Sequence, residues 1–277
     1  MKNGNLVTDI YLSELIRAGY YPKTIILIHP KTRTVNKKYK ILSFLIGKQK
    51  ANKLFIFNNS KKQYKRRKAF QNVVDVFLPK NIFEIRNLKM TDILNKLNVI
   101  SIESDNFNSD ELINCIKSNI KGVILVGASG ILKREILSIP DVKFINIHSG
   151  IVPNYKGLDN FFYSLLYNDP LGCSIFYIDE GIDTGKLIFK KKVQLLIDKG
   201  KLKEINHKEI HYAIKYYVKS YYKITVFIEY LNDSVKKYPQ LDLMNLSSYS
   251  QDKNVGRVFY ELHPEMEILV IDKIISK

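Results

Sequence analysis

The sequence has no tryptophan, only two cysteines and no long apolar run, and each scarcity narrows the kind of protein it encodes. Cys115 and Cys173 are too few and too far apart for a disulfide framework or a zinc knuckle, which favours a reducing compartment and buried thiols. No stretch approaches the roughly eighteen uncharged apolar residues that span a bilayer, and the start lacks the apolar core of a signal peptide. We therefore expect a cytoplasmic protein with no membrane partner.

Acidic residues are also scarce, since 44 Lys and Arg outnumber 27 Asp and Glu and give a net charge of +17. Clustered cations are what a phosphate backbone attracts, so a nucleic-acid partner stays open. The abundance of Lys, Ile, Asn and Tyr without Trp indicates instead an AT-rich genome whose surface cations drift towards Lys. Within the basic region 31–68, the run Lys61–Lys68 has a tyrosine among its cations that could stack on a nucleic-acid base. We favour the alternative that this run is a helix face exposed to solvent.

The order of apolar and polar segments predicts the fold. With 277 residues, 45% of them hydrophobic, the chain is long enough for a large domain with an extension. A helix from about Asp9 to Gly19 precedes an unbroken apolar strand at Thr24–Ile28. Further strands are expected at 54–57, 73–77, 99–102, 122–127, 144–148, 173–178 and 187–193, and helices at 109–119, 133–138, 158–167 and 206–231. This alternation predicts an α/β fold, doubly wound around a mostly parallel sheet.

The stretch Phe144–Gly157 holds the strongest candidates for chemistry. Asn146 and His148 are two residues apart on an expected strand, so both side chains point to the same side. An amide donor beside an imidazole suits stabilising an oxyanion and moving a proton. Asp183, in the loop 179–185, can bring a carboxylate to the imidazole.

Three ordered motifs carry a resemblance to a known family. They are Asn146-Ile-His148, Pro153-Asn-Tyr-Lys-Gly157 and Gly172-Cys-Ser-Ile-Phe-Tyr-Ile-Asp-Glu-Gly-Ile-Asp-Thr-Gly185. Together, over about residues 121–193, they resemble the 10-formyltetrahydrofolate-dependent formyltransferases, whereas the first motif alone would be weak evidence. The resemblance implies a Rossmann-like catalytic domain that takes 10-formyltetrahydrofolate as co-substrate and needs no metal. It also implies direct formyl transfer to a primary amine through a tetrahedral intermediate.

The resemblance also assigns site residues. Its catalytic Asn, His and Asp fall on Asn146, His148 and Asp183. The implied cofactor contacts are Gly127, Gly130, Ile131, Leu132, Asp179 and Gly181, with a plain tight turn as the alternative for the first four. The candidates for binding the acceptor are Tyr155 by stacking, Lys156 through a phosphate, and Gly157.

Both ends of the chain, and one residue of the motif, depart from the family. Met1–Ile10 is poor in apolar residues, so we expect the opening strand to be short or missing, and a start upstream stays open. We expect a catalytic domain at 1–205 and an extension at 206–277 that is helical and then strand-rich, with a strand at 266–275. Gly150 stands where relatives acting on purine precursors or initiator tRNA usually carry Ser. This difference weakens the inference that this chain uses the same acceptors.

The acceptor is the least determined feature. The segment Gly256–Pro264 is similar to tails of sugar N-formyltransferases of surface-polysaccharide pathways, and the last forty or so residues that contain it are too short to be the separate acceptor-binding domain of initiator-tRNA formyltransferases. We therefore favour a nucleotide-linked amino sugar. The alternatives are an initiator-tRNA formyltransferase or other RNA-binding protein, and a catalytically idle α/β interaction module. Homodimerisation stays open, and His207 with His211 would suit a metal only with a third ligand, which is not visible.

Overall fold

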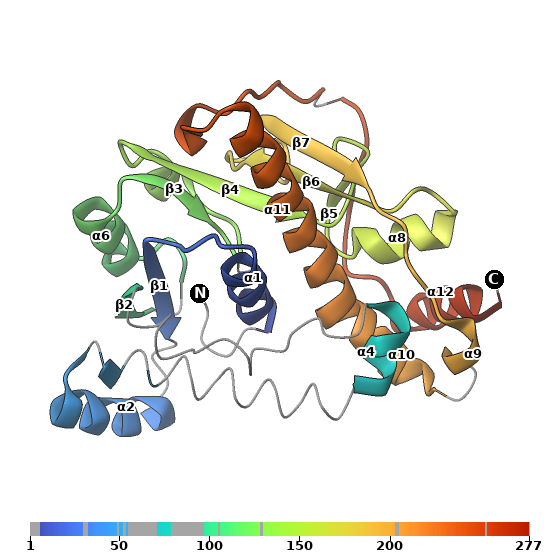
Figure 1. The fold of residues 1–277 in the computed structure, drawn as a ribbon, viewed down its shortest axis with the longest axis horizontal. Helices are drawn as coiled ribbons and strands as arrows, with labels where there is room; N and C mark the ends of the chain where they lie inside the picture. Colours follow the sequence, from blue (N-terminus) through green and yellow to red (C-terminus); the bar gives the residue numbers. More distant parts are fainter. Residues whose placement is uncertain are drawn as a thin grey trace. The chain divides into compact units, whose positions relative to one another are not determined.

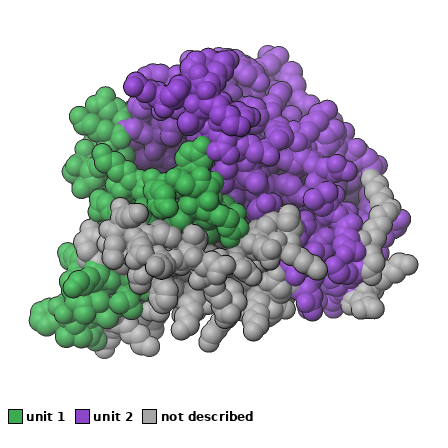
Figure 2. All heavy atoms as spheres, in the orientation of Figure 1, with its two compact units in different colours: residues 1–69, 83–121, 127–141 green, residues 70–82, 122–126, 142–277 purple. Residues whose placement is uncertain are grey.

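The computed structural model describes most of the chain and divides it into two compact units. The described residues are 6–29, 33–48, 50–51, 54, 71–78, 97–104, 106–127, 130–202, 205–252 and 254–276. The first unit comprises residues 1–69, 83–121 and 127–141, and the second comprises 70–82, 122–126 and 142–277 (Figure 2). Asn146, His148 and Asp183 all belong to the second unit.

The first unit contains a parallel pair of strands, β1 (Thr24–His29) and β2 (Asn98–Glu103), which run in register from end to end. The helix α1 (Leu6–Arg17) shares a buried apolar cluster with both strands, formed by Leu12, Ile16, Ile25, Leu27, Leu97 and Val99. The other helices of this unit are α2 (Arg33–Ile46), α6 (Asp110–Asn119) and α7 (Arg134–Leu137). Ser109 caps α6 by accepting a hydrogen bond from the Leu112 amide, as its position before the apolar run predicts.

The second unit contains a four-stranded sheet with the order β3-β4-β6-β7. Its strands are β3 (Gly122–Leu125), β4 (Val142–His148), β6 (Gly172–Tyr177) and β7 (Leu187–Lys192). β3 and β4 are parallel, whereas β6 and β7 are antiparallel to their neighbours. A separate parallel pair joins β5 (Tyr155–Gly157) to β8 (Arg257–Phe259), so the segment after β4 is tied to the C-terminal part of the chain.

Helices of the second unit cover this sheet and the segments around it. They are α4 (Gln71–Phe77), α8 (Asn160–Tyr167), α9 (Lys199–Leu202), α10 (His207–Ala213), the π-helical turn η2 (Ile214–Val218), α11 (Lys219–Lys237), the 3-10 turn η3 (Leu243–Asn245) and α12 (Pro264–Ser276). Figure 1 shows α11 crossing the sheet, where it packs against β4 and β6. The helix α12 packs against α8 and α10.

The predicted α/β class is confirmed, although antiparallel β6 and β7 make the larger sheet mixed. Two predicted strands are wrong. Residues 73–77 belong to α4, because Val73, Val76 and Phe77 are buried together at helical spacing. Residues 266–275 belong to α12, which opens with Pro264 and two glutamates, the residues that favour a first helical turn.

Some expectations are not tested by this description. The strand expected at 54–57 and the run 61–68 lie outside the described residues, apart from Leu54. The division into a catalytic domain at 1–205 and an extension at 206–277 stays a prediction. Among the described helices, none is both long and apolar enough to cross a bilayer.

Candidate active site

The carboxyl end of β4 presents two of the predicted side chains. Asn146 pairs with Phe176 of β6 and His148 pairs with Ser174, so both positions are fixed by the central ladder of the sheet. Since they are two residues apart, they lie on the same face, separated along the strand by about 6.6 Å. His148 is buried and Asn146 is half-buried. No hydrogen bond to the Asn146 amide is found within the described residues.

A buried serine that the sequence gives no reason to single out holds the turn after β4. Ser174 Oγ donates to the Gly150 carbonyl at 2.7 Å and accepts from the Val152 amide at 3.1 Å. Ser174 lies opposite His148 in the antiparallel ladder, so one residue of β6 fixes both the strand end and the turn. After this turn, the chain returns to His148, where the Tyr155 carbonyl contacts the imidazole.

The loop 179–185 presents the predicted carboxylate through several internal contacts. Asp179 Oδ1 accepts hydrogen bonds from the Gly181 amide at 3.1 Å and from Thr184 Oγ1 at 2.7 Å. Gln251 Nε2 donates to the Asp183 carbonyl at 3.2 Å and to the Gly185 carbonyl at 2.7 Å. Asp183 itself has a left-handed backbone with φ of 53°. A non-glycine residue in that region is uncommon and is found at sites where the surroundings hold the backbone in place.

The structure brings His148 and Asp183 together. Asp183 Oδ2 lies 3.4 Å from His148 Nδ1 and accepts a hydrogen bond of 2.7 Å from the Gly157 amide. Both contacts use the same carboxylate oxygen. Within the described residues, no hydrogen bond to Asp183 Oδ1 is found, so this oxygen is available to a substrate.

The other ring nitrogen of His148 is also in contact with the protein. His148 Nε2 lies 3.0 Å from the Tyr155 carbonyl and 2.8 Å from Asn160 Nδ2. Asn160 Nδ2 additionally donates to the Gly157 carbonyl at 3.0 Å. Because both nitrogens face protein groups and the side chain is only 6% exposed, the imidazole is held in one orientation.

Burial and neighbouring cations keep His148 neutral. Burial lowers the pKa of His148 below its ordinary value of 6.5, and only the Asp183 carboxylate and the hydrogen bond to Tyr155 oppose this. Lys223 and Lys219, both on α11, lower the pKa further. The pKa of Lys223 is itself lowered to about 8, first by burial and then by Lys219. Neither lysine is indicated by any motif.

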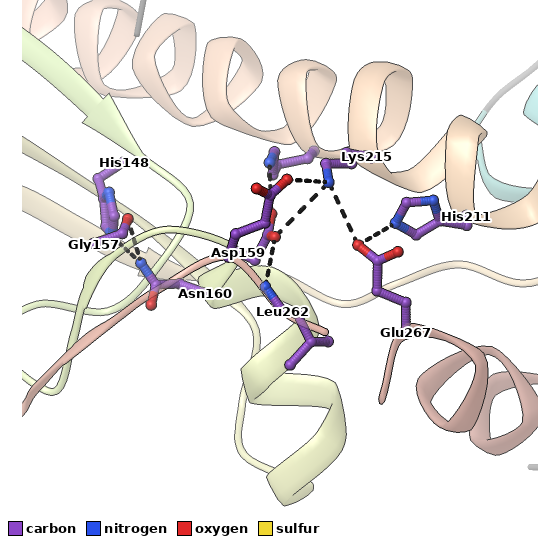
Figure 3. A network of polar contacts seen from close by, with 10 residues as sticks. His148, Gly157, Asp159, Asn160, His211, Lys215, Leu262 and Glu267 are labelled. Atoms are coloured by element: carbon purple, nitrogen blue, oxygen red, sulfur yellow. Dashed lines mark hydrogen bonds and ion pairs between the residues drawn. The ribbon is translucent and has the colours of Figure 1, made fainter. Parts of the chain in front are cut away.

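A network of charged groups surrounds the start of α8, directly beside Asn160 (Figure 3). The Asp159 carboxylate accepts a hydrogen bond of 3.2 Å from the Leu262 amide and lies 3.9 Å from the ammonium groups of Lys215 and Lys219. Lys215 also lies 3.4 Å from Glu267 of α12, whose carboxylate is 2.8 Å from His211 Nε2. The network therefore joins the start of α8 to α10, η2, α11 and α12.

Comparison with known proteins gives the family. The sequence signature described as "Formyl transferase" matches residues 22–220, which is more than half of the chain. The protein belongs to the formyl transferase family.

Individual relatives match over shorter stretches. The chain is 30% identical over 114 residues to a methionyl-tRNA formyltransferase of Halothermothrix orenii, covering 40% of this chain and 36% of that protein. It is 40% identical over 87 residues to the enzyme of the same name from Clostridioides difficile, covering 31% and 28%. The chain thus matches about a third of the length of these relatives. Among solved structures, it is similar to a formyltransferase from Anoxybacillus kamchatkensis in complex with UDP-4,6-dideoxy-4-formamido-L-AltNAc and tetrahydrofolate, with 21% identity, a TM-score of 0.39, and coverage of 66% and 82%.

The predicted folate residues lie in both units. Gly127, Gly130, Ile131 and Leu132 follow β3 and belong to the first unit, whereas Asp179 and Gly181 lie in the Asp183 loop. Asn108 holds the first group, since its side chain donates to the Ile131 carbonyl at 2.9 Å and accepts from the Lys133 amide at 2.6 Å. Ile131 is 67% exposed and Leu132 is buried. Their role in this family member stays a prediction.

The side chains of Tyr155 and Lys156, two of the residues predicted to bind the acceptor, contact other protein groups around β5. The Tyr155 ring stacks on Phe259 with a centroid distance of 5.1 Å, and its hydroxyl donates to Asp169. Burial and the Asp169 contact raise the pKa of Tyr155 above its ordinary range. Lys156 is buried and donates to the Val255 carbonyl at 3.1 Å. The backbones of two of these residues reach the site, Tyr155 through its carbonyl to His148 and Gly157 through its amide to Asp183.

Proposed function

We propose that this protein transfers a formyl group from 10-formyltetrahydrofolate to a primary amine. The observation that carries the proposal is the state of Asp183. One carboxylate oxygen is anchored by His148 and the Gly157 amide, while the other has no hydrogen bond within the described residues. A fixed carboxylate with one available oxygen suits removal of a proton from an attacking amine.

Asn146 supplies the second part of the chemistry. Its amide lies on the same face of β4 as His148 and makes no hydrogen bond within the described residues, so it can donate to the formyl oxygen. Negative charge gathers on that oxygen when the amine attacks, and a fixed donor there is worth on the order of a hundredfold or more in rate. Asp183 then takes the proton from the nitrogen that has formed the new bond. The bond between the formyl carbon and the folate nitrogen breaks, and that nitrogen leaves as tetrahydrofolate with a proton that Asp183 can return. His148 keeps Asp183 Oδ2 in place and stays neutral itself.

The chain also has groups that fit a folate. In the loop after β3, Gly130 has no room for a side chain, because a Cβ there would lie 2.5 Å from the Phe107 ring. The next residue, Ile131, exposes an apolar side chain that suits the face of a pterin ring. Gly127, Gly130, Ile131 and Leu132 are the residues of the first unit that we propose to contact the co-substrate. In the second unit, we propose Asp179 and Gly181 as its contacts. When bound, 10-formyltetrahydrofolate would supply the formyl carbon.

For the acceptor, we propose a nucleotide-linked amino sugar, as in polysaccharide biosynthesis. Support comes from an aromatic cluster that begins beside the site, where the Leu158 amide donates to the Phe259 carbonyl at 2.8 Å. Tyr163 and Tyr167 pack on Phe259, with centroid distances of 4.4 and 6.3 Å, and Tyr260 is 76% exposed. A nucleotide base stacks favourably on such rings. Tyr155 is buried against Phe259, whereas Tyr167 is 51% exposed and Tyr260 is more exposed still, so Tyr167 and Tyr260 are better placed to receive a base.

Initiator tRNA is the second candidate acceptor. The net charge of +17 favours a phosphate-rich partner, and the two sequence relatives described above are methionyl-tRNA formyltransferases. The two acceptors differ in a measurable way, because binding to tRNA weakens steeply with salt while binding of a small diphosphate weakens less.

The deciding experiment incubates the purified protein with 10-formyltetrahydrofolate and either a panel of amino-sugar nucleotides or charged initiator tRNA. Release of tetrahydrofolate, with a gain in acceptor mass of one CO unit, supports formyl transfer and identifies the acceptor. Asp183→Asn serves as the inactive control. Folate binding without turnover on any amine, or no folate binding at all, would favour the idle interaction module instead.

A further inference from the structure

Asn160 contacts His148 directly, although no motif points to it. It is the first residue of α8, it is only 1% exposed, and its amide lies between the imidazole and the Gly157 carbonyl (Figure 3). Nδ2 is 2.8 Å from His148 Nε2 and 3.0 Å from the Gly157 carbonyl oxygen.

The Gly157 contact fixes which way the Asn160 amide points. A backbone carbonyl only accepts hydrogen bonds, so the amide atom 3.0 Å from it must be the donor Nδ2. The same nitrogen therefore directs its second hydrogen at His148 Nε2. An imidazole nitrogen that accepts a hydrogen bond carries no proton, so the proton of the neutral ring is on Nδ1, which lies 3.4 Å from Asp183 Oδ2.

We propose that Asn160 is a positioning residue that holds neutral His148 in the tautomer with its proton on Nδ1, directed at Asp183. This inference rests on the proposed function, in which His148 keeps one oxygen of Asp183 in place so that the other can take a proton. Asn160 acts through His148 and is not assigned a contact with substrate.

A second group competes for the same ring nitrogen. The Tyr155 carbonyl lies 3.0 Å from His148 Nε2 and can only accept, so it favours a proton on that nitrogen. With the proton there, a neutral ring would turn a bare Nδ1 towards the Asp183 carboxylate, and the Asp183 contact would be lost. The charged groups that face the ring are Asp183, Lys219 and Lys223. Asn160 supplies the donor that decides between the two arrangements.

The Asn160 carbonyl oxygen is buried and has no hydrogen-bond partner within the described residues, which is unfavourable for the folded state. The contacts of the amide nitrogen must therefore account for the burial of this side chain. Its neighbour Asp159 has a left-handed backbone with φ of 49° and is held by the Leu262 amide and two lysines. The network around Asp159 thus anchors the residue that precedes Asn160.

The test is nitrogen NMR of the imidazole rings in the full chain, without folate or acceptor. The protein has five histidines, and His148→Gln identifies the signals of His148. We expect the wild-type ring to be neutral at pH 7 with the proton on Nδ1. In Asn160→Leu, which has a similar shape and no donor, we expect the proton on Nε2 and a higher pKa of His148. Asn160→Asp is expected to raise that pKa further, because a carboxylate beside the ring favours the charged form.

Turnover provides the second readout. We expect kcat of Asn160→Leu to fall about tenfold to a hundredfold, since Asp183 is no longer held in its productive position. Phe162→Leu is the matched control, because it removes buried volume from the same helix and leaves every contact of His148. It is expected to lower the melting temperature and to leave the tautomer unchanged.

The wild-type spectrum decides the proposal even if the variants fold poorly. A neutral His148 with its proton on Nε2 in the wild-type protein overturns it, and so does a tautomer that stays on Nδ1 in Asn160→Leu. Because the spectra need no substrate, a protein that transfers no formyl group but shows the expected tautomers would refute the proposed function and leave the positioning role standing.

Discussion

Gly150 offers a sharp test of how closely the site is packed. A Cβ at this position would lie 2.9 Å from His148 Nε2, 2.9 Å from the Tyr155 carbonyl oxygen and 3.0 Å from the Asn160 Cβ. Ordinary contacts of a methyl group are near 3.5 Å or longer, so these neighbours must move apart by about 0.5 Å to admit one. The backbone of Gly150 is not left-handed, so the cost of Gly150→Ala comes from these contacts alone.

The displacement falls on groups that set the site geometry. A misplacement of about 1 Å typically costs a hundredfold in rate, so a movement half as large predicts a loss of about tenfold in kcat. Extra volume in a tightly packed region is also expected to lower the free energy of unfolding by about 1–3 kcal/mol. Gly150→Ser adds a hydroxyl and is expected to be at least as damaging.

The assay compares initial rates of tetrahydrofolate release with urea unfolding for Gly150→Ala and for Ser149→Ala. Ser149 is the adjacent residue, and its side chain makes no hydrogen bond within the part of the chain that the structure describes, so its variant is expected to keep both activity and stability. A Gly150→Ala protein with a rate within twofold of wild type and an unchanged His148 spectrum would refute the packing argument.

Four further predictions follow from the site. Asn146→Ala is expected to lower kcat by on the order of a hundredfold or more while the melting temperature stays near that of wild type, and full activity would remove Asn146 from the mechanism. Asp183→Asn keeps the shape but not the base, so we expect a loss of about a hundredfold to ten-thousandfold in a pH–rate profile, and an unchanged profile would contradict its role. The Lys223 pKa is lowered in the folded state from 10.5 to about 8, so at this residue the unfolded chain binds more protons between these values. In urea titrations across that window, the stability of wild type relative to Lys223→Met is therefore expected to rise with pH, and a constant difference would contradict the burial of Lys223. Asp159→Asn removes the buried charge beside Lys215 and Lys219 and is expected to lower the free energy of unfolding by about 3–5 kcal/mol, whereas an equally stable variant would show that the network does not anchor α8.

Local sequence determined the strands that carry the site. The apolar run before His148 and the spacing of Asn146 and His148 predict a strand with both side chains on one face, and β4 has that form. Ser109 and Asn206 cap helices where their sequence context predicts it. These features depend on residues within a few positions of each other, so they can be seen in the sequence alone.

Short apolar segments were less certain because their period is ambiguous. The segment 73–77 is rich in valine, which favours a strand, but its buried residues fit one face of a helix. The segment 266–275 has the acidic first turn of a helix after Pro264, and this signal outweighed its β-branched residues. In both segments tertiary burial selected the helix.

Only the tertiary structure decided which distant residues surround His148. The motif predicted Asp183, and the antiparallel packing of β6 on β4 adds Ser174. Asn160 reaches the ring because the chain returns after Gly157, and Lys219 and Lys223 reach it because α11 packs on β4 and β6. Nothing near these residues in the sequence records those contacts, since the strength of a buried charge or hydrogen bond depends on neighbours that folding brings together. The sequence thus determined the candidate site residues, and the fold determined which groups surround His148 and lower its pKa.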